Sequence, residues 1–236
     1  MKIGLVIDDH MGRAGGVQEY MRGLRRYLVA QGHTTVIFAG GGGPPEPGVV
    51  PLGISIPARG SGSSTSIPLT LETPRRLRAL LDHEACDVLH ISSPYSPTLS
   101  GRLLAQSRAA HVMNFHVSIE PPWYLHSLGL LARTQHRSLR RFHARMAVSR
   151  AAEQTAKVLY GGDYVIVPDG IEVERFHPPA GRPRGARSHD EGTTILYVGR
   201  LDQRKGVAHL LRAAARLQDR MSGVRLQIGG DGPERE

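Results

Sequence analysis

Residues 2–7 read KIGLVI and residues 8–16 read DDHMGRAGG, and this stretch decides the fold. The first part is a short apolar run, which is typical of a buried parallel strand. The glycine pair Gly15 and Gly16 then precedes apolar residues at helical spacing, and Gly32 ends that pattern. The sequence therefore predicts a strand, a tight turn and a helix at the start of the chain.

The same alternation continues along the 236 residues. Further helices are expected at 72–83, 98–108, 123–142, 150–160 and 206–220, and further strands at 34–39, 87–91, 111–115, 146–148, 164–167, 194–198 and 224–228. Strands that alternate with helices form parallel sheets covered by helices on both faces. We therefore expect an α/β protein with a Rossmann-like, doubly wound parallel sheet that binds ligands at the carboxyl ends of its strands.

The composition limits the class of protein. Hydrophobic residues make up 40% of the chain, enough for a core, and 30 Lys and Arg against 21 Asp and Glu give a net charge of +9. This excess favours an anionic partner, such as a phosphate, a nucleic acid or an acidic membrane surface. The single cysteine, Cys86, cannot form an internal disulfide, which favours a reducing, cytoplasmic location. No apolar run approaches the roughly 18 residues that a membrane span needs.

Two segments interrupt the alternation. Residues 40–68 are rich in Gly, Pro and Ser, which predicts a long functional or flexible loop. Residues 178–192 are rich in Pro, Gly and Arg, which is typical of a linker. We expect a first domain at 1–180, a linker at 181–192 and the incomplete start of a second domain at 193–236. Two strands and one helix cannot close a doubly wound domain, so we expect a fragment or a protein that lacks most of its second half.

Several common motifs are missing from the sequence. No G-x-G-x-x-G follows the first strand and no acidic residue ends the second, which argues against a nicotinamide cofactor. The chain has no G-x-x-x-x-G-K-[ST] phosphate loop, no D-x-D metal clamp and no zinc pattern around Cys86. We therefore expect neither a metal nor a resident cofactor.

Three features remain that suit a phosphorylated ligand. Gly15 and Gly16 stand where the first helix begins, so backbone N–H groups can face an anion, although a plain tight turn explains them equally well. Arg200 and Lys205 lie between a strand and a helix, where two cations can hold a diphosphate or serve as solvated surface charges. His116 closes the strand at 111–115, and a lone histidine is more often structural than catalytic.

Taken in order along the chain, these residues resemble the GT-B glycosyltransferases of family 4, which are retaining enzymes that use nucleotide sugars. The matching motifs are GGVQ at 15–18, CDVLH at 86–90, FH at 115–116, AVS at 147–149, VPDGI at 167–171, VGRLD at 198–202, RKG at 204–206 and GGDGP at 229–233. The resemblance covers the whole chain, and the subfamily that it most suggests is the phosphatidylinositol mannosyltransferases of actinobacteria.

The resemblance implies a GT-B amino-terminal domain followed by the start of a second Rossmann-like domain. It implies transfer of a hexose, with mannose as one candidate, from a nucleotide-diphosphate sugar to a lipid or glycan acceptor. A cleft between the two lobes would hold the diphosphate. The implied catalytic residues are His116, Arg200 and Lys205, the implied donor-binding residues are Gly15, Gly16, Arg200 and Lys205, and the implied acceptor-binding residues are Asp9 and Gln18.

The sequence departs from the family pattern in two places. The family's E-x-x-x-x-x-x-x-E motif, which binds the donor, is absent up to Glu236. After His90, where relatives often place a second polar ligand, this chain has Ser92, Ser93 and Pro94. These departures predict that the 236-residue polypeptide transfers sugar poorly by itself.

A basic segment suggests where a lipid acceptor would lie. Residues 121–152 hold no acidic residue, and Trp123 precedes a run of arginines that includes Arg133, Arg137, Arg140 and Arg141. An aromatic lead followed by an arginine-rich helix is typical of helices that bind anionic membranes. We expect these five residues to contact the inner face of the cell membrane, while a core helix with one solvated basic face explains the pattern equally well.

Other functions stay open at this stage. A GT-B-shaped sugar-nucleotide epimerase shares the fold and the donor, and a non-catalytic module would bind an acceptor or a membrane without transfer. The sequence has no zinc finger, aromatic RNA-binding motif or homeodomain signature, so we expect no nucleic-acid partner.

Overall fold

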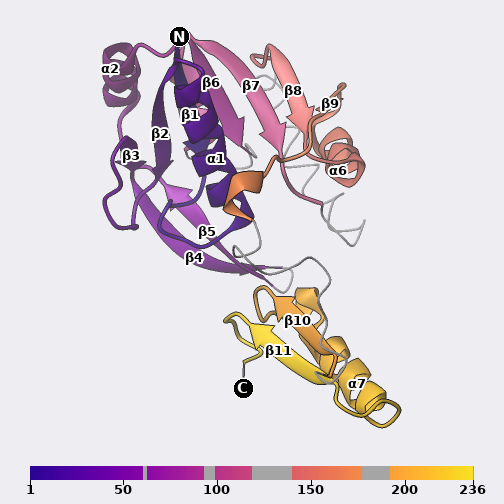
Figure 1. Ribbon diagram of the computed structural model, residues 1–236. Coiled ribbons are helices and arrows are strands. Elements are labelled where there is room, and N and C mark those ends of the chain that lie inside the picture. Colours follow the sequence, from indigo (N-terminus) through magenta and orange to yellow (C-terminus); the bar gives the residue numbers. More distant parts are fainter. Residues whose placement is uncertain (61–62, 93–98, 119–139, 177–191, 236) are drawn as a thin grey trace. The chain divides into compact units, whose positions relative to one another are not determined.

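The computed structural model describes residues 1–60, 63–92, 99–118, 140–176 and 192–235 (Figure 1). These residues form two compact units. The first unit is Met1–Pro57 with Ser66–Glu172, and the second is Ala58–Thr65 with Val173–Glu236.

The first unit is built on a seven-stranded parallel sheet (Figure 1). Its strands are β1 (Lys2–Ile7), β2 (Thr34–Gly40), β3 (Val49–Leu52), β6 (Val88–Ser92), β7 (Ala110–Phe115), β8 (Ala144–Ala147) and β9 (Val165–Ile166). They lie in the order β3-β2-β1-β6-β7-β8-β9, so β1 has β2 on one side and β6 on the other. The strand order therefore reverses between β1 and β6, and such a reversal opens a ligand crevice at the carboxyl ends of the strands.

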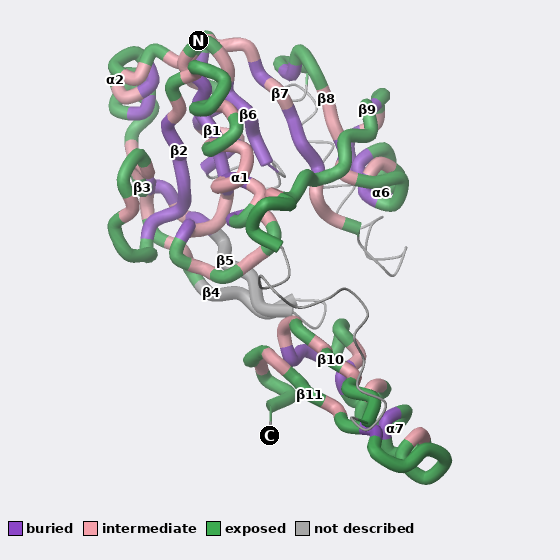
Figure 2. Tube along the Cα trace, viewed as in Figure 1, coloured by how far each residue is buried: buried purple, intermediate pink, exposed green. Residues whose placement is uncertain are grey.

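Helices cover both faces of this sheet. On one face, Ile3, Leu5 and Ile7 of β1 pack with Met21 of α1 (Gly16–Ala30). On the other face, Val6 belongs to the cluster formed with α2 (Pro74–Glu84), α3 (Ser100–Gln106) and α6 (Arg150–Tyr160). Figure 2 shows the inner strands as the buried layer of this unit. The predicted doubly wound parallel sheet is confirmed.

The prediction of a loop at 40–68 is wrong. This segment contains β3 and two further strands, β4 (Ile54–Gly60) and β5 (Ser63–Leu69), which form a two-stranded sheet of their own. Pro51 is tolerated because β3 is an edge strand of the large sheet, where a missing N–H costs little. Gly53, at φ +69°, makes the left-handed turn between β3 and β4. Gly and Pro in this segment therefore mark edges and turns between short strands.

The predicted helices differ from the observed ones mainly at their ends. The predicted helix at 98–108 is observed as α3 over Ser100–Gln106. The predicted helix at 123–142 lies almost entirely outside the described residues, and its last positions, Arg140 and Arg141, form a turn.

The second unit contains a small parallel βαβ arrangement. Strand β10 (Thr194–Val198) pairs in parallel with β11 (Arg225–Gly229), and α7 (Val207–Gln218) lies between them in sequence. The one-turn helix η2 (Gln203–Lys205) precedes α7. Gly230 packs so closely that a Cβ there would lie 1.8 Å from the carbonyl oxygen of Gly199. The predicted start of a second Rossmann-like domain is confirmed.

The left-handed conformation of Ala85 at the end of α2 predicts that glycine is more stable than alanine at this position. Ala85 ends the helix at φ 45° and ψ 49°, and its N–H donates to Leu81 O at 2.9 Å. A left-handed conformation costs a non-glycine residue about 1–2 kcal/mol, and a glycine at Ala85 would avoid this cost. The greater entropy of glycine in the unfolded chain opposes the gain in stability by about 0.5–1 kcal/mol. We expect Ala85→Gly to raise the free energy of unfolding by about 0.5–1 kcal/mol in urea titrations.

The matched control for this prediction is Ala79→Gly, at an exposed interior position of the same helix. This control should destabilise by about 1 kcal/mol, because glycine is a poor residue for a helix interior. Equal destabilisation by both variants would contradict the prediction.

Candidate functional site

Polar side chains collect at the carboxyl edge of the large sheet, beside the point where the strand order reverses. His90 and Ser92 lie in β6, Asn114 lies in β7 and His116 follows β7 directly. Buried polar groups at this edge are the expected lining of a ligand site in an α/β fold. With Tyr20 of α1 and Asp169 after β9 they form a connected set, named here the switch-point cluster: Tyr20, His90, Ser92, Asn114, His116 and Asp169.

Tyr20 connects β6 and β7 within this cluster. Its hydroxyl accepts from Asn114 Nδ2 at 3.0 Å and lies 3.1 Å from His90 Nε2. The Tyr20 hydroxyl can donate to a bare Nε2 of His90 or accept from an Nε2–H, according to the tautomer of His90. Burial lowers the pKa of His90 to about 4, helped by the neighbouring His116 and opposed by Asp169. Burial likewise raises the pKa of Tyr20 to about 12, so both groups are neutral at pH 7.

His116 is held on several sides. Its Nε2 lies 3.1 Å from Ser92 Oγ, and its Nδ1 lies 3.4 Å from Asp169 Oδ2. The ring of Tyr20 meets the His116 ring edge to face, with the centroids 4.8 Å apart. Only 4% of the His116 side chain is exposed. The structure thus brings the histidine expected beside the transferred sugar into contact with three residues of other elements.

Asn114 carries a side-chain acceptor that has no partner among the residues that the structure describes. Its side chain is buried, and in the described part of the chain no hydrogen-bond donor reaches its Oδ1. Buried polar atoms in folded proteins nearly always have a partner. An unpaired oxygen in this cluster is therefore suited to a ligand hydroxyl or a bound water.

Asp9 and Gln18, the two residues expected to face an acceptor, are in contact. Gln18 is buried, and its Nε2 donates to Asp9 Oδ2 at 3.2 Å and to His10 O at 3.3 Å. Arg13 also reaches Asp9 Oδ2, at 3.2 Å. Gln18 and Arg13 therefore fix the Asp9 carboxylate at the end of β1, while the acceptor role of the pair stays a prediction.

Gly15 and Gly16 begin α1 at the same edge of the sheet. Gly15 caps the helix in an extended conformation, and a Cβ there would lie 2.4 Å from Gln18 Oε1. Gly16 is exposed, and a Cβ there would have no atom within 4 Å. Since the first N–H groups of a helix have no partner within it, this open position is suited to a phosphate.

Arg200 and Lys205 share one carboxylate in the second unit. Asp202 is buried; its Oδ1 accepts from the backbone N–H of Lys205 at 3.2 Å, and its Oδ2 lies 3.5 Å from Arg200 Nε. The carboxylate thus holds the Arg200 guanidinium and the backbone of Lys205 at the turn between β10 and α7. Gly16 belongs to the first unit, so the common diphosphate cleft stays a prediction.

Of the five residues expected at a membrane, Trp123, Arg133 and Arg137 lie outside the described residues. Arg140 is exposed. The guanidinium of Arg141 donates to the carbonyls of Ala105 and Ser107, both at 2.8 Å, and so satisfies carbonyls at the end of α3. Among the described helices, none is both long and apolar enough to cross a bilayer. Membrane contact stays a prediction.

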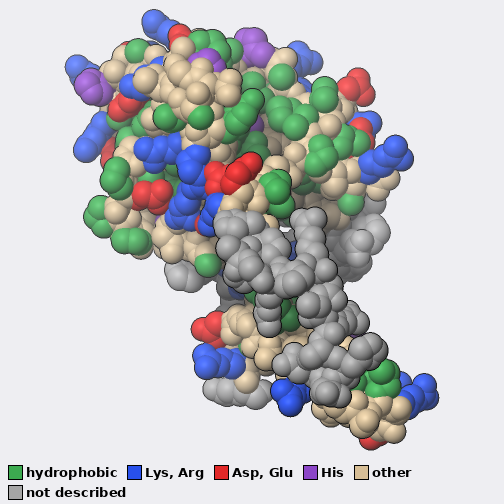
Figure 3. Space-filling model, viewed as in Figure 1, with side chains coloured by type: hydrophobic (Ala, Val, Ile, Leu, Met, Phe, Trp, Pro, Cys, Tyr) green, Lys and Arg blue, Asp and Glu red, His purple; other side chains and the backbone are tan. Residues whose placement is uncertain are grey.

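Along α1, basic and acidic side chains are paired. Arg22 lies 3.1 Å from Glu19 and 3.2 Å from Glu46, and Arg26 pairs with Glu172. Figure 3 shows blue and red side chains beside one another on the face of the first unit where α1 runs. These arginines are therefore neutralised within the unit.

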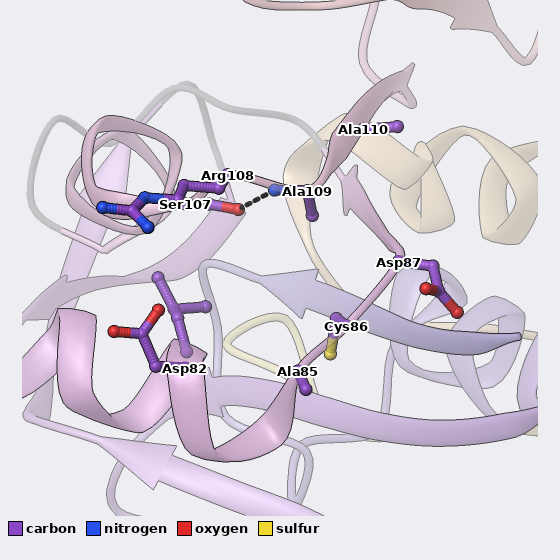
Figure 4. Close-up of a pocket in the computed structure, with 9 residues that line it drawn as sticks. Asp82, Ala85, Cys86, Asp87, Ser107, Arg108, Ala109 and Ala110 are labelled. Atoms are coloured by element: carbon purple, nitrogen blue, oxygen red, sulfur yellow. Dashed lines mark hydrogen bonds between the residues drawn. The ribbon is translucent and has the colours of Figure 1, made fainter.

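A separate pocket of about 470 Å³ lies at the opposite edge of the sheet, where β6 and β7 begin (Figure 4). Asp82, Cys86, Asp87 and Arg108 contribute to its lining, and burial raises the pKa of the Cys86 thiol. Doubly wound sheets bind ligands at their carboxyl ends, so this pocket is at the wrong edge for the expected reaction.

Sequence reasoning placed His116 correctly at a strand end but assigned no role to Tyr20, Ser92, Asn114 or Asp169. Tyr20 looked like part of the apolar face of α1, and it does contact that core. Asn114 could have been found from its position just before Phe115 and His116 at the end of a strand. Ser92 and Asp169 have no sequence spacing that links them to His116, because pairing across the sheet creates the contact.

Comparison with solved structures shows the class of fold. Sucrose-phosphate synthase from Thermosynechococcus elongatus matches with a TM-score of 0.64 at 19% identity, over 100% of this chain and 64% of that one. A structure of Anabaena HepE with UDP-glucose matches with a TM-score of 0.61 at 14% identity, over 98% of this chain and 61% of that one. The fold is that of the GT-B glycosyltransferases, as expected.

Sequence comparison gives the family. Residues 14–175 match the model described as Glycosyltransferase Family 4, and residues 183–236 match Glycosyl transferases group 1. The chain belongs to glycosyltransferase family 4.

Individual relatives agree with the subfamily that the sequence suggested. The phosphatidyl-myo-inositol mannosyltransferase of Mycolicibacterium smegmatis is 31% identical over 100% of this chain, and that of Mycobacterium tuberculosis H37Rv is 30% identical over 98%. The matched regions are 60% and 61% of those two relatives, so the chain spans about three fifths of their length. These relatives favour a transferase over an epimerase.

Proposed function

We propose that the protein is a hexosyltransferase that moves a hexose, with mannose as the first candidate, from a nucleotide-diphosphate sugar to a lipid or glycan acceptor, and that the 236-residue chain by itself transfers poorly. The observation that carries the proposal is the switch-point cluster, which places His116 at the ligand edge of a family 4 fold. The names of the relatives make phosphatidylinositol the first acceptor to test.

In the proposed reaction, the bond between the sugar's anomeric carbon and the diphosphate breaks, and a bond from that carbon to the acceptor oxygen forms on the same face. The leaving diphosphate oxygen takes the acceptor proton. Arg200 and Lys205 offset the charge that develops on the diphosphate, and the Gly16 amide is a further proposed contact of the donor. His116 lies beside the sugar, and Asp9 with Gln18 faces the acceptor.

Donor binding tests this proposal directly. Calorimetric titration of the chain with GDP-mannose, UDP-glucose, GDP and UDP should show saturable binding of at least one nucleotide sugar and its diphosphate. A module that binds only an acceptor or a membrane has no affinity for any of them, and that result would overturn the proposal. An epimerase would release a free isomerised nucleotide sugar, whereas a transferase gives a glycosylated acceptor.

The proposed contact between the Gly16 amide and the diphosphate predicts that a substitution at Gly16 lowers diphosphate affinity, whereas a matched substitution elsewhere in α1 does not. Gly16→Ala adds a methyl group at the helix start, and we expect at least a tenfold loss of diphosphate affinity because the phosphate cannot approach the amide. Gly23→Ala makes the same change at another position of α1 where a Cβ meets nothing within 4 Å, and it should leave affinity unchanged.

In the second unit, we expect Arg200→Ala and Lys205→Ala each to lower diphosphate affinity by about tenfold, because each removes a charged hydrogen-bond donor. Arg212→Ala, at an exposed position of α7, is the control and should change affinity less than twofold. Equal losses from all three arginine and lysine variants would point to a diffuse charge effect and contradict specific contacts.

A further inference from the structure

His116 lies in a chain of three polar groups that come from distant parts of the sequence. Asp169 Oδ2 lies 3.4 Å from Nδ1 of His116, and Ser92 Oγ lies 3.1 Å from Nε2. Ser92 ends β6, His116 follows β7, and Asp169 follows β9, so the fold brings them together across the edge of the sheet. Both ring nitrogens of the histidine are thereby engaged.

The chemistry of the partners assigns the protons on this ring. An ionised carboxylate can only accept a hydrogen bond, so the nitrogen facing Asp169 carries the proton. A neutral ring then has a bare Nε2, which accepts the hydroxyl proton of Ser92. Ser92 by itself does not fix this choice, because a serine hydroxyl can donate to a bare nitrogen or accept from an N–H.

The burial of Ser92 excludes another interpretation of this arrangement. The same order of carboxylate, imidazole and hydroxyl activates serine nucleophiles in hydrolases. A nucleophile must reach its substrate, whereas Ser92 is only 1% exposed. Of the two partners of His116, Asp169 is partly exposed, at 39% of its side chain, whereas Ser92 is buried. The arrangement is therefore built to hold the imidazole.

The neighbouring aromatic ring limits the movement of His116 further. Tyr20 meets the imidazole at 63° with the centroids 4.8 Å apart, and Tyr20 is itself held by Asn114 and His90. His90 is neutral at pH 7 because burial lowers its pKa to about 4, so it adds no positive charge beside His116. Asp169 is thus the charged partner that faces the ring in this cluster.

We propose that Asp169 is a positioning residue that fixes the tautomer and orientation of His116, with Ser92 holding the other nitrogen. This role rests on the proposed function, in which His116 lies beside the transferred sugar. Asp169 then acts on the sugar only through the imidazole. Its loss should weaken recognition of the sugar and spare the diphosphate.

The first experiment tests the pairing without any ligand. Nitrogen-15 NMR of histidine-labelled chain at pH 8 reports which ring nitrogen of His116 carries the proton, with His116→Gln used to assign the signal. We expect the Nδ1–H tautomer in the unchanged chain and an increased share of Nε2–H in Asp169→Ala. Asp169→Asn keeps an acceptor oxygen and should restore the Nδ1–H form. An unchanged tautomer in Asp169→Ala would overturn the proposal.

The second experiment tests the link to the sugar. We expect Asp169→Ala to weaken binding of the nucleotide sugar about tenfold, as for loss of one charge-assisted contact, and to change binding of the matching nucleoside diphosphate less than twofold. The control is Asp163→Ala, at an exposed carboxylate of the same unit, which should change neither. Equal loss for both ligands, or loss for neither, would overturn the positioning role.

The two experiments separate this inference from the proposed function. Failure of the unchanged chain to bind any donor would refute the proposed function and, with it, the role in sugar recognition. The tautomer measurement would still decide whether Asp169 fixes the His116 ring.

Discussion

Asp8→Ala is expected to lower the free energy of unfolding of the first unit by about 2–4 kcal/mol. The Asp8 carboxylate accepts from the backbone N–H of Ser100 at 2.9 Å and from its hydroxyl at 2.7 Å. Ser100 is 1% exposed, so the substitution leaves two buried donors without their partner. The lost carboxylate also sits at the start of α3, where negative charge favours the helix.

The measurement is a urea titration read by hydrogen exchange and mass spectrometry at peptides from β1 and α3, which report on the first unit. Asp8→Asn keeps one acceptor oxygen and should lose about half as much stability. Asp82→Ala, at an exposed carboxylate of α2, is the matched control and should stay within about 0.5 kcal/mol of the unchanged chain. A loss of free energy of unfolding within about 0.5 kcal/mol in Asp8→Ala would contradict the prediction.

The Asp8 contact illustrates what the sequence could and could not predict. The strand at 2–7 and the helix near 100 both follow from local apolar patterns, and both are observed. The bond between Asp8 and Ser100 joins residues 92 positions apart, and it depends on β1 and β6 being neighbours in the sheet. Local periodicity indicates the elements, whereas the sheet order selects their partners.

The error at 40–68 has a different cause. Composition rich in Gly, Pro and Ser is typical of loops, but backbone pairing needs no apolar side chain. Strand β3 is four residues long and is interrupted by Pro51, so its apolar run is too short to stand out in this segment. Short edge strands of this kind are the part of a parallel sheet that composition predicts least well.

The candidate site could be predicted only in part, because local patterns indicate strand ends but not which residues meet across the sheet. His116 was singled out because it follows a clear strand, and Asp9 and Gln18 were singled out through the resemblance to the family. The residues that complete the switch-point cluster, Ser92 and Asp169, are polar groups on separate strands or loops. Their proximity to His116 comes from the parallel pairing of β6, β7, β8 and β9.

Acidification from pH 7 to pH 5 is expected to remove about 2 kcal/mol of stability through His90 alone. Burial lowers its pKa to about 4 in the folded chain, against about 6.5 for an exposed histidine. Above pH 6.5 both states are neutral and His90 has no effect. Between pH 6.5 and pH 4 the unfolded chain binds a proton that the folded chain does not, so stability falls as the pH falls.

His90→Gln removes this titration and keeps an amide that can donate to or accept from the Tyr20 hydroxyl, which lies 3.1 Å from His90 Nε2. In urea titrations at pH 7 and pH 5, the variant should lose about 2 kcal/mol less than the unchanged chain between the two conditions. His83→Gln, at an exposed position near the end of α2, should keep the full loss. An equal loss in the unchanged chain and in His90→Gln would mean that the folded protein binds the proton at His90 as readily as the unfolded chain does. Burial of His90 would then not be what keeps its ring neutral beside Tyr20 and His116.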